Sequence, residues 1–163
     1  GDFTIDFRLR MNAFPASNQS FDFVGDGYTT GFLVQYYHEA TTKRARVWLA
    51  NSFFDFTWTP STASWYHCAV TRSGTDLRFF VDGVQTGSTQ TSSDNVGGTG
   101  ELRVADDPVD TPGHMVNGWI DELRISKGIA RWTANFTPPT SAYSDDSLVT
   151  VFPSYRSLLS VGI

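Results

Sequence analysis

Hydrophobic and polar residues alternate along FTIDFRLRM, residues 3–11. Successive side chains of a β-strand point to opposite faces, so a period of two predicts a strand. Thr4, Asp6, Arg8 and Arg10 would lie on the face in water. The hydrophobic residues, which would face a core, are Phe3, Ile5, Phe7, Leu9 and Met11. The segment therefore predicts a half-buried strand, with one solvated face.

Other short segments have the same strand-like pattern and are separated by turn-forming residues. LRFFVDGVQTG predicts a β-hairpin around Asp82 and Gly83, because these residue types tolerate the left-handed backbone of a tight turn. No segment shows a convincing helical period of about 3.6 residues. Short strands joined by polar turns predict an all-β protein with an antiparallel β-sandwich or jelly roll. The other strand-like segments are GFLVQYY, RARVWLA, WYHCAVTRSG and ELRVA.

The composition indicates one ordered globular domain. The chain has 163 residues, of which 40% are hydrophobic and 15% aromatic, so it can bury a sizeable core. Its net charge of −5 lacks the basic character of a nucleic-acid-binding protein. Cys68 is the single cysteine, which excludes an intrachain disulfide. No apolar run approaches the roughly 18 residues that span a bilayer. We therefore expect no nucleic-acid partner and no membrane insertion.

Two adjacent acids, Asp121 and Glu122, lie in the strand-like start of GWIDELRISKGIARWTANFTPP (118–139). In a regular strand Asp121 shares a face with Leu123 and Ile125, so it points inward with them unless a bulge shifts the register. A buried carboxylate requires hydrogen bonds, an arginine or a metal ion. Asp121 could therefore be a hydrogen-bonded structural residue, a calcium ligand or a catalytic group.

A calcium site would draw on further acids near Asp121. The loop DDPVDTPG, just before the acid pair, offers Asp106, Asp107 and Asp110. Carboxylate and carbonyl oxygens are the ligands that calcium prefers in proteins. Calcium is the one cofactor that the sequence suggests.

The pattern of acids argues against an enzyme. Glycoside hydrolysis on a sandwich of this kind requires two carboxylates that face the same groove. Adjacent acids such as Asp121 and Glu122 point to opposite faces of a regular strand. The sequence contains no G-x-S-x-G, H-E-x-x-H or P-loop motif. His38, His67 and His114 show no ligand spacing, and we expect no catalytic activity.

Three segments together resemble the laminin-G-like, concanavalin A-type jelly rolls. They are FTIDFRLR, WYHCAVTRSGTDLRFFVDG and GWIDELRISKGIARWTANFTPP, and they occur in the family's order within residues 1–143. In sequence pattern, these segments most resemble the copies of the domain in bacteriophage virion and tail-fibre proteins and in large bacterial surface proteins. The resemblance implies two curved antiparallel sheets packed face to face, used for adhesion, glycan binding or structure.

The resemblance also assigns places to individual segments. It makes residues 65–70 a central strand, 77–84 a hairpin and 120–125 the last long strand of the body. Trp132 and Phe136 would anchor the following segment against the sandwich, and Asp121 would be a buried polar residue of that signature.

In one respect the sequence departs from the family pattern. Such domains usually carry one or two strands and an acidic loop before the strand FTIDF. We expect these strands upstream, or an equivalent from SLVTVF near the end of the chain. Residues 144–163 would then be a strand that returns to the sheet or the lead into a following segment. Asp26, in GDGYTTG, is a further candidate calcium ligand.

Aromatic residues near predicted loops are candidates for contact with a glycan or a protein partner. A sugar site combines an aromatic platform with amide or carboxylate hydrogen bonds. These aromatics could instead fill the core or an interface with neighbouring subunits. The candidates are Tyr28, Tyr36, Tyr37, Asn51, Asp55 and Trp58, with Trp48 and Trp65 as further aromatic supply.

The sequence therefore predicts a non-catalytic structural or adhesion module. The resemblance places it on a bacteriophage fibre, spike or capsid surface, where it would contact other virion subunits, form a homo-oligomer or bind a host-surface glycan. The alternative is a carbohydrate-binding domain of a bacterial surface or secreted protein, located outside the cell.

Overall fold

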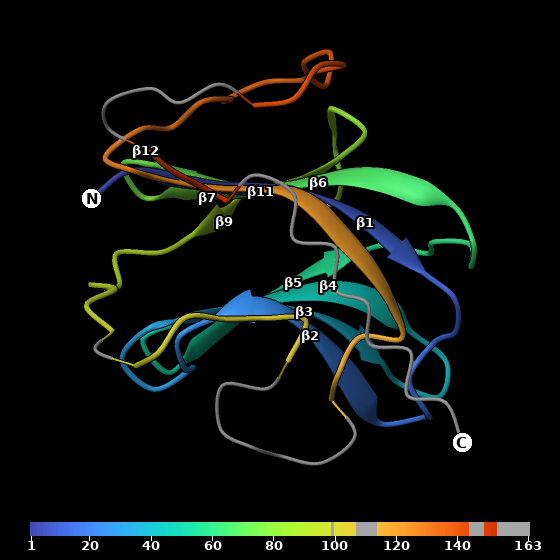
Figure 1. The fold of residues 1–163 in the computed structure, drawn as a ribbon. Coiled ribbons are helices and arrows are strands. Elements are labelled where there is room, and N and C mark those ends of the chain that lie inside the picture. Colours follow the sequence, from blue (N-terminus) through green and yellow to red (C-terminus); the bar gives the residue numbers. More distant parts are fainter. Residues whose placement is uncertain (99, 107–113, 144–148, 153–163) are drawn as a thin grey trace.

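The computed structural model describes residues 1–98, 100–106, 114–143 and 149–152 of the chain. Two antiparallel sheets pack face to face, which confirms the predicted all-β sandwich (Figure 1). No α-helix occurs in the described residues, and none of them forms a helix that could span a membrane.

In the described residues, the larger sheet has the strand order β12-β11-β1-β6-β7-β8, and β9 also pairs with β7. Its strands are β1 (Phe3–Met11), β6 (Trp65–Ser73), β7 (Asp76–Val81), β8 (Val84–Gln85), β9 (Gln90–Thr91), β11 (Gly118–Lys127) and β12 (Val149–Phe152). The smaller sheet has the order β10-β2-β3-β4-β5. Its strands are β2 (Gln19–Gly25), β3 (Phe32–His38), β4 (Lys43–Leu49), β5 (Ser52–Thr57) and β10 (Arg103–Val104).

The predicted hairpin and central strand are both confirmed. Asp82 and Gly83 connect β7 to β8 with φ values of 49° and 78°, the positive values that a two-residue hairpin turn requires. Gly83 also has no room for a side chain, because a Cβ there would meet the carbonyl oxygen of Phe136. β6 lies between β1 and β7, in the middle of the larger sheet.

The alternation of β1 builds the core as predicted. Ile5, Phe7, Leu9 and Met11 are buried between the sheets, where the ring of Phe7 lies 5.7 Å from that of Phe23 on β2. Cys68 on β6 is fully buried in the same core, and burial raises the pKa of its thiol well above the ordinary value.

Residues 129–143, which we call the strap, cross the outer face of the larger sheet (Figure 1). Trp132 and Phe136 stack with their centroids 3.9 Å apart and pack against His67, and Phe136 also contacts Phe80. Both tryptophan and phenylalanine therefore act as the anchors that the sequence predicted. The prediction that this face of β1 lies in water is wrong, because the strap covers it and Asp6 is fully buried.

Asp6 lies at the centre of a buried polar network beneath the strap. Arg124 on β11 donates to its two carboxylate oxygens from Nε and Nη2 at 3.0 and 2.8 Å. His67 Nε2 is 3.5 Å from the carboxylate and 2.9 Å from the hydroxyl of Tyr143. Burial alone raises the pKa of Asp6, but hydrogen bonds from His67, Arg124 and Tyr143 and the charge of Arg124 outweigh it and hold that pKa below its ordinary value.

Asp121 does not point into the core, which corrects the sequence prediction. The pairing of β1 with β11 shifts register between Asp6 and Arg8, and Glu122 opposite this shift has a φ of 52°. This bulge turns Asp121 outward, where it is exposed and its Oδ1 accepts the N–H of Glu122 at 2.9 Å. The buried acid of the sheet is therefore Asp6, from a different strand.

β12 pairs with the edge of β11, from Ser126↔Val149 to Leu123↔Phe152. A strand thus forms at Val149–Phe152, within the C-terminal segment. Residues 144–148 and 153–163 lie outside the described residues, and the boundary at residue 143 stays a prediction.

We predict that Asp6→Ala lowers the free energy of unfolding by about 3–5 kcal/mol, because it leaves the buried guanidinium of Arg124 unpaired. Asp121→Ala, the matched control on an exposed site, should change it by less than about 0.5 kcal/mol. Urea unfolding followed by tryptophan fluorescence measures both values. Equal unfolding midpoints for the two variants would contradict the central role of Asp6.

The lowered pKa of Asp6 also predicts an acid dependence of stability. Its contribution is complete above the unfolded-state pKa of about 3.9 and is lost as the pH falls through the lower folded-state pKa. Between about pH 5 and about pH 2 the wild-type unfolding free energy should therefore fall more steeply than that of Asp6→Asn, which cannot titrate there. Parallel curves for the two proteins would be the contrary result.

Candidate contact surfaces

The outer face of the smaller sheet carries a cluster of aromatic and charged side chains. On β4, Ala45, Val47 and Leu49 are buried against the core, so Arg46 and Trp48 point outward. The strap covers the other sheet, and it lies on the far side of the sandwich from this face (Figure 1).

Arg46 is the centre of this group. Its guanidinium carbon lies 4.3 Å from the ring centroids of both Tyr37 on β3 and Phe53 on β5, and 6.0 Å from that of Trp48. Arg46 also donates two hydrogen bonds to Asp55, at 2.7 and 3.0 Å. These five residues, Tyr37, Arg46, Trp48, Phe53 and Asp55, are called the Arg46 cluster below.

The ion pairs of the cluster balance its charge. Asp55 accepts a further hydrogen bond from Arg44 at 2.8 Å, and Arg44 also pairs with Glu39. Partial burial raises the pKa of Asp55, but the hydrogen bonds and charges of Arg46 and Arg44 outweigh it, so the net pKa lies below the ordinary value. Two arginines thus pair with two carboxylates, and these four charges sum to zero.

Four of the predicted contact residues lie at this surface. Tyr37 and Asp55 belong to the cluster, and the ring of Tyr28 lies 5.4 Å from that of Trp48. Asn51 is exposed in the tight turn between β4 and β5, where its N–H donates to the carbonyl of Tyr28 at 2.6 Å. The structure therefore brings Tyr28, Tyr37, Asn51 and Asp55 to one face.

Two predicted contact residues are corrected by the structure. Tyr36 and Trp58 are buried, with exposed fractions of 0% and 6%, and their rings pack edge to face in the core. They cannot reach a ligand on the surface. Burial raises the pKa of Tyr36 to about 12, as expected for a phenol inside the sandwich.

The sequence reasoning missed Arg46 and Phe53. Phe53 is 51% exposed, the largest exposure among the rings of the cluster. The alternation Phe53, Asp55, Thr57 along β5 places these residues on one face, opposite Phe54 and Phe56. The sequence RARVWLA alternates in the same way. Aligning the two alternating segments as neighbouring strands would have predicted that Arg46 and Phe53 share an outer face.

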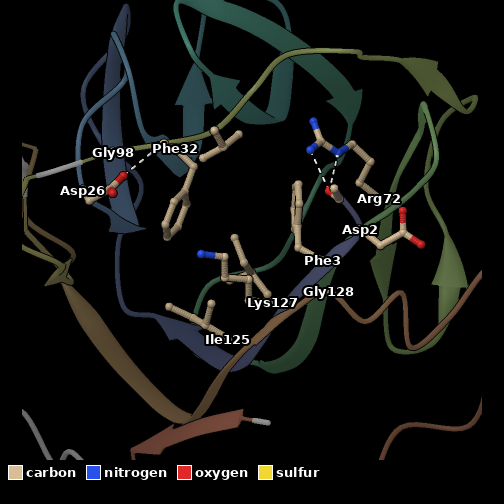
Figure 2. Close-up of a pocket in the computed structure, with 13 residues that line it drawn as sticks. Asp2, Phe3, Asp26, Phe32, Arg72, Gly98, Ile125, Lys127 and Gly128 are labelled. Carbon is tan, nitrogen blue, oxygen red and sulfur yellow. Dashed lines mark hydrogen bonds between the residues drawn. The ribbon is translucent and has the colours of Figure 1, made fainter.

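A pocket of about 370 Å³ opens between the sheets, at the end where β1 begins. Figure 2 shows the rings of Phe3 and Phe32 on either side of it and Lys127 reaching between them. Arg72 and Asp26 also line it, but Arg72 is bound to main-chain carbonyls and Asp26 accepts the N–H of Phe32 at 2.8 Å. The walls are mostly apolar, and Arg72 and Asp26 are already hydrogen-bonded, so the pocket has few groups that could orient a sugar.

The predicted calcium ligands do not gather in the described part of the chain. Asp26 lines the pocket between the sheets, whereas Asp121 lies on the outer face of the larger sheet, opposite Arg8. Asp106 lies 3.9 Å from Arg103, and Asp107 is outside the described residues. Among the residues the structure describes, no three or more His, Cys, Asp or Glu side chains come together in a way that could hold a metal ion. Those residues do not fit a calcium site built from this set.

We predict that Asp55→Ala destabilises the protein by about 1.5–3 kcal/mol, because hydrogen bonds from both Arg44 and Arg46 are lost at a partly buried site. The control is Asp76→Ala, which removes the more exposed ion pair with Arg78 and should cost less than about 1 kcal/mol. Chemical unfolding at neutral pH compares the two. A cost for Asp55→Ala no larger than that for Asp76→Ala would show that the cluster is loosely held.

Solved structures with a similar fold share little sequence with the chain. A putative carbohydrate binding protein from Bacteroides ovatus is 15% identical, with a TM-score of 0.62 over 83% of this chain and 38% of that one. Domain 4 of AbnA, an extracellular arabinanase from Geobacillus stearothermophilus solved with arabinotriose, is 16% identical (TM-score 0.54; 76% and 59% covered). Tailspike protein 2 of bacteriophage CBA120 is 10% identical (TM-score 0.53; 77% and 22% covered).

These likenesses show the fold, and the chain spans well under half the length of the Bacteroides protein. No curated protein sequence matches the chain significantly. The family model of the concanavalin A-like lectin/glucanases superfamily, Laminin_G_3, matches residues 1–131. The chain therefore belongs to the Laminin_G_3 family, of the concanavalin A-like lectin/glucanases superfamily.

Proposed function

We propose that this chain is a non-catalytic adhesion module that binds a neutral glycan through the Arg46 cluster. The observation that carries the proposal is the packing of three aromatic rings around one ion-paired arginine on the outer face of the smaller sheet. Phe53 is half exposed, and Tyr37 and Trp48 are partly exposed beside it. Rigid rings held by strands form a preorganised platform.

The chemistry of the cluster suits a sugar. The apolar face of a pyranose or furanose can stack on Phe53 or Trp48, while its hydroxyls exchange hydrogen bonds with Asp55 and the guanidinium edges. Because the two arginines are balanced by two carboxylates, these ion pairs carry no net charge that would select an acidic or a basic ligand. Proteins of similar fold support a glycan ligand, among them the AbnA domain solved with arabinotriose.

Binding is favoured over hydrolysis at this surface. A glycosidase requires one carboxyl group that stays protonated to act as the acid and a second one beside it. Asp55 has a lowered pKa and is ionised at neutral pH, and Glu39 is paired with Arg44. The cluster thus lacks the protonated acid that such a mechanism needs.

We further propose that the module acts on the surface of a virion, in a fibre or spike, with a bacterial cell surface or the extracellular space as the alternative. The likeness of its fold to that of a bacteriophage tailspike supports this placement, together with the sequence resemblance described above. Contacts with other virion subunits and self-assembly belong to the same proposal. Recovery of the chain in fixed copy number with purified particles would test it.

A glycan array with neutral and carboxylated oligosaccharides, arabinotriose among them, tests the glycan proposal. We expect Phe53→Ala to weaken binding to the neutral sugars about tenfold or more, since it removes the most exposed ring of the platform. The control Val84→Ala truncates an equally exposed hydrophobic residue on β8 and should leave binding unchanged. A wild-type protein that is folded and binds no neutral sugar would overturn the proposal.

The same array, run with calcium and then with a chelator, addresses the calcium prediction. The Arg46 cluster needs no cation, so neutral-sugar binding should be equal in both conditions. Loss of binding in the chelator would assign the metal a role that the described residues do not explain.

A further inference from the structure

Four rows of side chains cross the outer face of the larger sheet, each with β1 in the middle. Residues paired directly across strands point to the same side, so each row is set by the register of β1 with β6 and β11. The rows centred on Thr4, Asp6 and Arg8 all bond to the strap: Thr4 to residues 129 and 131, Asp6 to Tyr143, and Arg8 to the carbonyl of Pro139.

The fourth row makes no bond to the strap in the described residues, and its two outer side chains are exposed. It consists of Trp65 on β6, Arg10 on β1 and Trp119 on β11, and we call it the Trp-Arg-Trp row. Trp65 is 48% exposed and Trp119 is 39% exposed. Exposed tryptophans are uncommon, and here two of them flank one cation on adjacent rigid strands.

Among the residues that the structure describes, the cation in this row has no acidic partner. Arg10 lies over the ring of Trp119, with its guanidinium carbon 4.5 Å from the centroid. Its Nε donates to the carbonyl of Ala63 at 3.1 Å and its Nη1 to Asn12 at 2.9 Å. In the described part of the chain, no ion pair involves Arg10 and no hydrogen bond uses its Nη2.

The surroundings of the row add neutral hydrogen-bonding groups. Asn12 and Asn117 are exposed, and their side-chain amides lie 3.5 Å apart at the same end of the sheet as Trp119. On the neighbouring row Asp121 faces Arg8, so that row adds one charge of each sign. The Trp-Arg-Trp row therefore differs from the neutral Arg46 cluster by one uncompensated positive charge.

We infer that the Trp-Arg-Trp row is a second contact site, which binds a carboxylated sugar such as a uronic or sialic acid within an oligosaccharide. Neighbouring strands are about 4.8 Å apart, so the two tryptophans stand about 10 Å apart with Arg10 between them. A short oligosaccharide that stacks on these rings places a carboxylate against the guanidinium, which binds carboxylates in a charge-assisted fork. Asn12 and Asn117 are placed to bond its hydroxyls.

This site lies on the other sheet and takes another class of ligand from the Arg46 cluster. Neither site needs the other to bind. If both act, one domain contacts neutral and acidic sugars on opposite faces of the sandwich.

Calorimetric titration with an oligogalacturonate tests the inference, and its methyl ester is the matched neutral control. We expect Trp119→Ala and Arg10→Gln each to weaken binding about tenfold or more. The methyl ester should bind more weakly by a similar factor, and added salt should weaken only the acidic form. Sialyllactose and lactose form a second acidic and neutral pair, for a site that prefers sialic acid.

Two variants keep the result interpretable. Phe53→Ala should leave oligogalacturonate binding unchanged. Loss of acidic-sugar binding at the Trp-Arg-Trp row can therefore be distinguished from loss of neutral-sugar binding at the Arg46 cluster. Trp119→Phe retains a ring and should retain most of the affinity, which separates stacking from a general effect on the fold. Unfolding midpoints confirm that each variant is folded.

The inference fails if neither acidic sugar binds the wild type, if the esters bind equally well, or if Trp119→Ala and Arg10→Gln bind like the wild type. It also fails if the wild type self-associates through this row, Trp119→Ala abolishes that association and no acidic sugar binds. That last result would assign the row to a contact between copies of the chain.

Discussion

The ion pair between Asp6 and Arg124 is the interaction on which the larger sheet and its cover both depend. Two charges can be buried together when each satisfies the hydrogen bonds of the other, and their bidentate geometry meets this condition. The pair joins β1 to β11 and also faces Tyr143 at the end of the strap. The guanidinium carbon of Arg124 lies 3.9 Å from the centroid of the Tyr143 ring. Tyr143 is partly buried, and this burial with the nearby Asp6 charge raises its pKa.

The strap also decides which surfaces remain for binding. A sandwich buries one face of each sheet and leaves two outer faces. Here residues 129–143 close most of one outer face with Trp132 and Phe136, so the exposed aromatic residues of that sheet are found where the strap does not reach. The Arg46 cluster lies on the other sheet, which the strap does not touch. Among the described residues, the exposed tryptophans of the larger sheet are thus those that the packing of one irregular segment leaves accessible.

Much of the fold could be predicted because its signals are local. Alternation predicted the inward face of β1. The backbone preference of Asp82 and Gly83 alone predicted the hairpin between β7 and β8. The candidate site was harder, because β5 and its flank carry hydrophobic residues on both faces. Alternation cannot say whether Phe53 or Trp58 faces the core when both positions are aromatic. Burial of Asp6 likewise depends on a segment more than a hundred residues away in sequence, which no local pattern reveals.

One residue of β11 shows how a small irregularity decides which side chains reach the surface. In a regular strand Trp119 would share the inward face with Leu123, as would Asp121, for which the sequence predicted this orientation. The bulge at Glu122 adds one residue against β1, so Ile120 is buried and Trp119 turns outward beside Arg10. The same bulge lets Glu122 accept the N–H of Tyr143 at 2.7 Å, which ties the end of the strap to the sheet. The local shift that fastens the cover is therefore also the one that exposes the tryptophan of the proposed acidic-sugar site.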